Sequence, residues 1–214
     1  MTISDIALQQ LIDLVGDLNS LQIYEEHDLW TYIWGTPFFS SAKAYVHLTG
    51  YRVIHAAFNW LWKSACQNKH KVFFWLVMKD RLSTRELYRR RNMILPDYNC
   101  VLCPSTVEES LTHLFIHCPF SQACWASIGL NVSTHDPFDN LDQFKHQLVI
   151  PFFMEIIVLM SWSIWMQRND FIFKGIQQTT VNCFQHFKKE FALVILRAKV
   201  RFKDSMSSWL AAHV

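Results

Sequence analysis

Five side chains that commonly bind metals occur close together in the segment Cys100–Cys118, whose sequence is CVLCPSTVEESLTHLFIHC. Cys100 and Cys103 form a Cys-x2-Cys pair, a spacing that lets two thiolates reach one tetrahedral zinc ion. The second pair of ligands is either His113 with Cys118 or His113 with His117. Four nitrogen and sulfur ligands complete the coordination of zinc and leave no position for water, so the pattern predicts a structural zinc site.

The residues around these ligands favour zinc over the alternative, a set of ordinary buried or free thiols. Pro104 and Ser105 favour a turn directly after the first pair. Leu111, Leu114 and Phe115 follow and are expected to pack beside the ion. Spacing, turn residues and apolar residues therefore all indicate a small zinc module.

The sequence contains six cysteines, but it does not begin with a basic and then apolar signal peptide. We therefore expect reduced thiols and an intracellular protein, nuclear or cytoplasmic, that is not secreted. Cys66, Cys124 and Cys183 lie among apolar residues and are expected to be core thiols.

Composition and periodicity predict an all-α protein. Apolar residues make up 51% of the 214 residues, while there are only 5 glycines and 6 prolines, too few for a β-sandwich rich in tight turns. Apolar periodicity and capping residues predict the helical segments. We expect a polar gap over residues 67–71 and a loop with a short helical turn over residues 131–146. The predicted helices are 4–20, 42–48, 72–78, one from Thr84, 119–128, a buried one from about 148 to Gly175, and one long helix from Thr179 or Thr180 through Trp209.

The apolar stretch 148–166 approaches the length of a membrane span. Pro151 interrupts it, Glu155 lies within it, and a polar run begins at Gln167. These features favour a central buried helix, and no membrane partner is expected.

Charge is unevenly distributed along the chain. Residues 1–36 contain six acidic residues and no lysine or arginine, whereas residues 69–91 contain eight basic and two acidic residues. Ser83 and Glu86 have the spacing of a capping box, which predicts a helix whose basic residues face outward. A solvated helix face is the simple interpretation, and contact with nucleic-acid phosphates is the functional one. The candidate nucleic-acid-binding residues are Lys71, Arg81, Arg85, Arg89, Arg90 and Arg91.

Motifs typical of catalysis are not found in the sequence. It contains no glycine-rich phosphate loop, no Gly-x-Ser-x-Gly motif and no paired aspartates after an aromatic residue, as a two-metal polymerase site would need. We therefore expect no catalytic residues and no enzyme activity in this chain.

The segment from about Asp28 to Leu130 resembles the zinc-binding domain that follows the polymerase in plant LINE-type (non-LTR) retrotransposon reverse transcriptases. The resemblance rests on DLWTYIW, FFSSAKAY, WLWKSACQNKHKVFFWLVMKDRLSTRELYRRR, CVLC, Glu108 and Glu109, HLF, and Cys118 with Trp125 behind it; IWMQRNDFIFKG resembles the segment that follows. It implies Cys100, Cys103, His113 and Cys118 as zinc ligands, with His117 a neighbour. The polymerase and ribonuclease H domains of such polyproteins are not present in this sequence.

This resemblance implies an all-α fold with an inserted zinc-knuckle loop and a structural zinc ion. We expect three regions: 1–39, an N-terminal helix and lead-in; 40–130, the zinc-binding domain; and 131–214, a long-helix region. The function expected is non-catalytic binding of RNA or DNA, with the polymerase domain as a further partner. The alternatives are a structural or protein-interaction module and an inert remnant of a retroelement.

Overall fold

A computed structural model describes residues 5–21, 30–50, 55–132 and 137–213. This part of the chain is helical and contains no β-strand beyond an isolated bridge between Asn99 and Glu108, so the all-α prediction is confirmed. The chain divides into two compact units, residues 1–53 and 54–214. The expected boundaries at residues 39 and 130 remain predictions.

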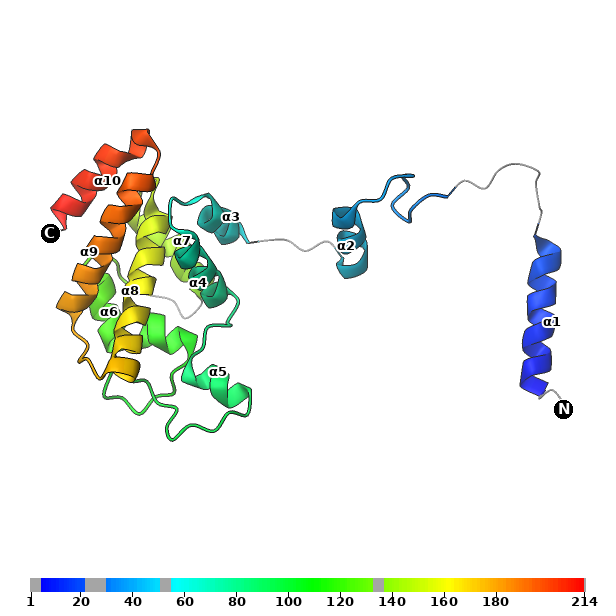
Figure 1. Cartoon of the computed structure of the whole chain (residues 1–214), viewed down its shortest axis with the longest axis horizontal. Helices are drawn as coiled ribbons and strands as arrows, with labels where there is room; N and C mark the ends of the chain where they lie inside the picture. Colours follow the sequence, from blue (N-terminus) through cyan, green and yellow to red (C-terminus); the bar gives the residue numbers. More distant parts are fainter. Residues whose placement is uncertain (1–4, 22–29, 51–54, 133–136, 214) are drawn as a thin grey trace. The chain divides into compact units, whose positions relative to one another are not determined.

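In the described residues of the first unit, the chain forms the helices α1 (Asp5–Ser20) and α2 (Ser41–Thr49) (Figure 1). Ser40 caps α2, because its side-chain oxygen accepts a hydrogen bond from the backbone N–H of Lys43 at 3.3 Å. Part of the expected lead-in, and with it Glu25, Glu26 and Asp28, lies outside the described residues. The apolar side chains of α1 are all exposed: Ile6, Leu8, Leu11, Ile12, Leu14, Val15 and Leu18.

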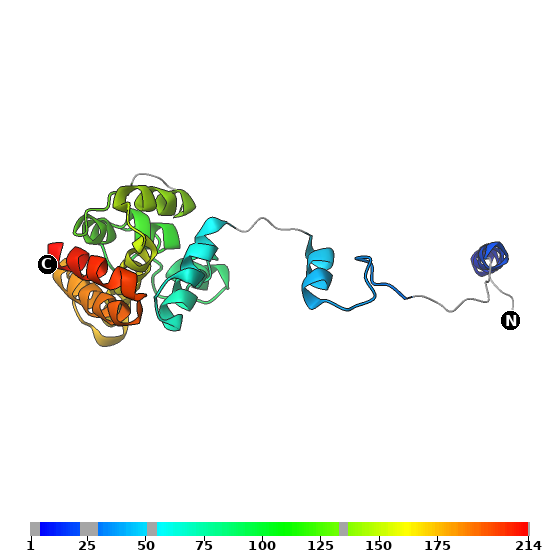
Figure 2. The ribbon, with the colours of Figure 1, turned by 90° about the horizontal axis from the view of Figure 1, so that it is seen from above.

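The second unit is built around one helix, α8 (Phe153–Lys174), which lies among the other helices of this unit (Figures 1 and 2). Buried residues occur on all sides of α8, which is typical of a helix in the centre of a domain. Gly175 ends it in the left-handed conformation with a φ of 67°, as predicted. The surrounding elements are α3 (Ala56–Lys63), α4 (Asn68–Met78), α5 (Arg85–Arg90), η1 (His113–His117), α6 (Pro119–Ala126), α7 (Pro137–Leu148), α9 (Thr180–Arg197) and α10 (Val200–Ala212).

None of the helices in the described segments has both the length and the apolar character that crossing a membrane requires. Cys66, Cys124 and Cys183 are buried as free thiols, which confirms their prediction as core residues.

The prediction of a loop over 131–146 was wrong, because Pro137–Leu148 forms helix α7. The segment is polar on average, but Leu141 and Phe144 lie on one helical face and are 6% and 2% exposed. The ring of Phe144 packs 4.9 Å from that of Trp125. A narrow apolar face was therefore enough to anchor a helix that is otherwise hydrophilic.

Two helix starts near the basic segment also differ from their predictions. Helix α4 begins at Asn68, so the expected gap over 67–71 is the first turn of the helix. The cap of α5 is Thr84, whose side-chain oxygen accepts from the backbone N–H of Leu87 at 3.3 Å, and the predicted Ser83 is not the cap. Polar first turns are common in helices, because the leading N–H groups have no acceptor within the helix and are satisfied by polar side chains or water.

The predicted single C-terminal helix is two helices, α9 and α10, separated by extended backbone at Ala198 with a ψ of 155°. The cap predicted for its start is confirmed, because the Thr179 side chain accepts from the backbone N–H of Asn182 at 3.0 Å. The break lets α10 fold back along α9, as Figure 2 shows. It places the ring of Trp209 5.4 Å from that of Phe191, so partial burial of a large aromatic side chain favours the turn over a straight helix.

Candidate zinc site

The first two cysteines lie on a loop that short backbone pairing closes. The N–H of Cys100 donates to the carbonyl of Val107 at 2.8 Å, and the N–H of Glu109 donates to the carbonyl of Tyr98 at 2.9 Å. These bonds bring residues 98–100 beside residues 107–109 and leave 101–106 as the loop. Cys100 therefore lies at the base of the loop, and Cys103 lies within it.

The other half of the site is η1, a single π-helical turn. In a regular α-helix, residues five apart point about 140° away from each other, whereas residues four apart share a face. Regular helix would thus favour His113 with His117. In η1 the N–H of Cys118 donates to the carbonyl of His113 at 2.7 Å, which widens the turn by one residue. This wider turn brings the Cys118 thiol to the same side as the His113 ring.

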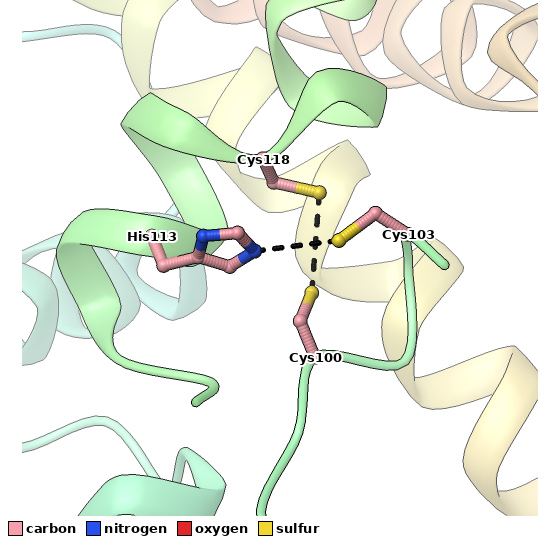
Figure 3. A group of neighbouring side chains, drawn as sticks. All are labelled: Cys100, Cys103, His113 and Cys118. Atoms are coloured by element: carbon pink, nitrogen blue, oxygen red, sulfur yellow. Dashed lines mark hydrogen bonds between the residues drawn. The ribbon is translucent and has the colours of Figure 1, made fainter. Parts of the chain in front are cut away.

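The side chains of Cys100, Cys103, His113 and Cys118 point toward a common centre (Figure 3). Their ligand atoms all lie within 4.8 Å of one another. The Sγ atoms of Cys100 and Cys118 are 3.9 Å apart, and Sγ of Cys103 lies 3.4 Å from Nε2 of His113. His117 is not one of the four, although it ends the same turn.

These distances fit a zinc ion. Tetrahedral zinc has bonds of about 2.3 Å to sulfur and about 2.0 Å to nitrogen, which separate neighbouring ligand atoms by about 3.5–3.8 Å. Cys100, His113 and Cys118 are buried, with exposed fractions of 5%, 7% and 0%, and Cys103 is half-buried. Thiolates and imidazole are the donors that structural zinc sites use, so the donor set matches the ion as well as the spacing does.

A hydrogen bond between the thiols of Cys100 and Cys118 agrees with a metal site. The hydrogen bond from the Cys100 thiol lowers the pKa of Cys118 to about 5, although burial acts in the opposite direction. The same hydrogen bond and burial raise the pKa of Cys100. One thiolate is therefore already favoured in this cluster, and the positive charge of a metal ion would favour the others.

Buried hydrogen bonds fix the turn that carries His113 and Cys118. The indole N–H of Trp125 donates to the carbonyl of Phe115 at 2.7 Å, and the hydroxyl of Ser121 donates to the carbonyl of Leu114 at 2.5 Å. Both donors come from α6, which begins at Pro119 directly after the last cysteine. A π turn leaves carbonyl groups without their usual helical partners, and α6 supplies donors for two of them.

Comparison with known proteins supports this interpretation. Residues 39–125 match the family model described as zinc-binding in reverse transcriptase. This segment is therefore similar to the zinc-binding domains of reverse transcriptases. The resemblance predicted from the sequence is confirmed, and zinc is the cofactor of the family.

One curated relative matches beyond this domain. The chain is 28% identical over 173 residues to an Arabidopsis thaliana protein named "Putative ribonuclease H protein", and the match covers 75% of this chain. The chain spans only 27% of the length of that relative. The expected plant origin agrees with the organism of this relative. No solved structure matches the chain.

A buried ion pair, which the sequence did not predict, ties the zinc-binding domain to α8. Arg168 donates from Nη2 to Oε1 of Glu109 at 2.7 Å and from Nε to both carboxylate oxygens at 3.2 and 3.3 Å. The same Oε1 accepts the backbone N–H of Arg85 at 3.1 Å. The available signal was that both residues belong to the pieces on which the family resemblance rests, the pair Glu108 and Glu109 and the segment IWMQRNDFIFKG. Nothing in those segments shows that the two residues meet.

The structure places the predicted nucleic-acid-binding residues in three different situations. Three of the arginines form ion pairs: Arg85 with Asp97 at 3.2 Å, Arg89 with Glu108 at 2.7 Å, and Arg90 with Asp80 at 2.7 Å. Lys71 lies apart from them on α4 and donates to the carbonyl of Trp62 at 3.0 Å. Arg81 and Arg91 are exposed and form no ion pair with another described residue. The basic helix is therefore partly neutralised.

Proposed function

We propose that the chain is a non-catalytic accessory module, held together by a structural zinc ion, that binds single-stranded RNA or DNA. The observation that carries the proposal is the four-atom cluster of Cys100, Cys103, His113 and Cys118 in a reverse-transcriptase zinc-binding domain. We assign these four residues as the zinc ligands. Zinc modules of this kind recur in proteins that bind single-stranded nucleic acids.

Four protein ligands leave zinc without an open position, so the ion would stabilise structure and would not activate water. This supports a role without enzyme activity. The activity in the name of the Arabidopsis relative belongs to that protein, of which this chain matches 27%. Thiolate ligands and six free cysteines also fit a reducing compartment, and we infer a nuclear or cytoplasmic location.

Binding of nucleic acid would rest on positive charge near the phosphate backbone. Arg81 and Arg91 are exposed and form no ion pair with another described residue, whereas carboxylates compete with phosphate for Arg85, Arg89 and Arg90. The direct test measures the affinity of the purified chain for labelled single-stranded RNA and DNA at increasing salt. A steep loss of affinity with salt would support phosphate binding, and affinity that does not change with salt would contradict it.

A second candidate function is docking onto another protein, such as the polymerase domain. The observation that favours it is the row of exposed apolar side chains on α1, which includes Ile12 and Leu18 at 54% and 57% exposure. Exposed apolar stripes commonly mark protein interfaces. Replacing Leu11 and Leu18 with Gln would abolish such docking and leave binding of nucleic acid unchanged.

A further inference from the structure

A cleft of about 760 Å³ opens on the second unit, away from the zinc ligands. Its walls come from the end of α3, the start of α4, the start of α8, and the turn between α9 and α10. These segments are far apart in sequence, and α8 lies between the two pairs of helices (Figures 1 and 2). The volume is in the range of ligand-binding clefts.

Positive charge dominates the lining of this cleft. Lys63, Arg197, Lys199 and Arg201 are exposed, and Lys71 is half-buried. None of the five forms an ion pair with a residue in the described part of the chain. Cations gathered around a concave surface reinforce one another's field, which attracts anionic ligands.

The acidic residue that lines the cleft does not cancel this charge. Glu155 is 7% exposed, and its Oε1 accepts the backbone N–H of Ala65 at 2.7 Å. Burial raises the pKa of the Glu155 carboxyl, which favours its neutral form relative to an exposed glutamate. The cleft thus has a cationic rim above a carboxyl group that is turned inward.

Aromatic side chains accompany the cations. Trp60 and Phe202 both line the cleft and are half-buried, so part of each ring faces the open space. The guanidinium of Arg201 lies 4.6 Å from the centre of the Phe202 ring. Lysine and arginine side chains that follow a strand of phosphates, with aromatic rings on which bases stack, are the usual components of single-strand-binding grooves.

This arrangement contrasts with the basic helix α5. Three arginines of α5 are paired with carboxylates, whereas the cations of the cleft are unpaired within the described structure. Lys71, predicted from the sequence to act with the arginines of α5, lines the cleft instead. A phosphate group entering the cleft would not need to displace a carboxylate from a cation, so binding there would cost less.

We infer that the cleft between α3–α4 and the α9–α10 turn is the principal binding groove for single-stranded nucleic acid. The inference rests on the proposed function and names the surface that performs it. Lys63, Arg197, Lys199 and Arg201 contact phosphates, and Trp60 and Phe202 offer surfaces for base stacking.

The test compares two triple variants of the full chain that lose the same positive charge. Lys63→Gln/Lys199→Gln/Arg201→Gln alters the cleft, and Arg81→Gln/Arg89→Gln/Arg91→Gln alters the basic segment around α5. A third variant, Lys63→Arg/Lys199→Arg/Arg201→Lys, keeps the charge of the cleft. Fluorescence anisotropy with labelled single-stranded RNA and DNA of one sequence, from about 50 to about 200 mM salt, measures the affinity and its salt dependence. Circular dichroism and zinc content verify that each variant is folded.

We expect the charge-removing cleft variant to lose about tenfold or more in affinity and the slope of log K against log salt to decrease by about 2, since each single-strand phosphate contact contributes about 0.7. The charge-keeping variant should bind as the wild type does, and the control triple variant should change affinity less. Equal losses of affinity in the two charge-removing variants, or a larger loss in the control, would contradict the assignment of the cleft as the binding groove. The proposed function would not be contradicted by either result. A wild-type chain that binds neither strand at about 50 mM salt would overturn both.

Discussion

Arg168 of α8 and Glu109 of the zinc-binding domain form a buried ion pair, with Nη2 and Oε1 2.7 Å apart and side chains that are 5% and 0% exposed. Glu109 lies beside the paired segment that closes the zinc-binding loop, and its carboxylate also accepts a backbone N–H from the start of α5. A single carboxylate therefore connects the loop, α5 and the central helix. The ion pair therefore attaches the zinc-binding domain to the core through a residue that is not a zinc ligand.

We predict that Arg168→Met destabilises the second unit by about 3–5 kcal/mol, because it leaves the Glu109 carboxylate buried without its charged partner. Glu109→Gln should be similarly destabilising, since it leaves Arg168 unpaired. Urea unfolding followed by circular dichroism gives the free energy of unfolding. The double variant Arg168→Met/Glu109→Gln should lose less than the sum of the two single variants. Additive losses, or a loss below about 1 kcal/mol for Arg168→Met, would show that the pair does not join these elements.

The cap of α5 gives a second prediction. Thr84→Ala should destabilise the protein by about 1–2 kcal/mol, because the N–H of Leu87 loses its side-chain acceptor. Ser83→Ala, one residue earlier, should change stability by less than about 0.5 kcal/mol. Thermal unfolding of the two variants makes a matched comparison. A larger loss of stability in Ser83→Ala than in Thr84→Ala would show that Ser83 caps α5, as the sequence suggested.

A third prediction concerns pH. Burial lowers the pKa of His70 to about 4 from an ordinary value of 6.5, even though Glu190 acts in the opposite direction. The unfolded state therefore binds a proton that the folded state does not between pH 6.5 and 4. The stability that depends on unprotonated His70 is fully present above pH 6.5. The free energy of unfolding should fall by up to about 1.4 kcal/mol for each unit of acidification between pH 6.5 and 4.

The measurement for His70 is the free energy of unfolding as a function of pH in the wild type and in His70→Gln. The variant should show a weaker dependence on pH between 6.5 and 4, while the contribution of the zinc ligands stays common to both proteins. Parallel curves would mean that His70 does not resist protonation in the folded state.

The sequence predicted features that local chemistry determines. The Cys-x2-Cys pair, the cap at Thr179 and the stop at Gly175 each depend on a few neighbouring residues, and the structure has all three. The central helix was predictable because its apolar run is too long to be anything but buried or membrane-spanning. Local chemistry did not decide between His117 and Cys118, because the choice depends on a π turn that α6 stabilises through Trp125 and Ser121.

Features that depend on tertiary contacts were missed. Helix α7 is anchored by Phe144 against Trp125, and the break after Arg197 is favoured by packing of the partly buried Trp209 against Phe191. Neither partner is close in sequence. The basic helix shows the same limitation, since arginines that appear clustered in the sequence meet Asp97, Glu108 and Asp80 in space.

The measurement that tests the account most directly is the zinc content of the purified, reduced chain by elemental analysis. Three variants accompany the wild type: Cys118→Ser, His117→Ala and, as a control in the core, Cys66→Ser. We predict one zinc ion per wild-type chain, loss of zinc in Cys118→Ser, and retention in His117→Ala and Cys66→Ser. A folded wild-type chain without zinc, or loss of zinc in His117→Ala with retention in Cys118→Ser, would contradict the assigned ligands.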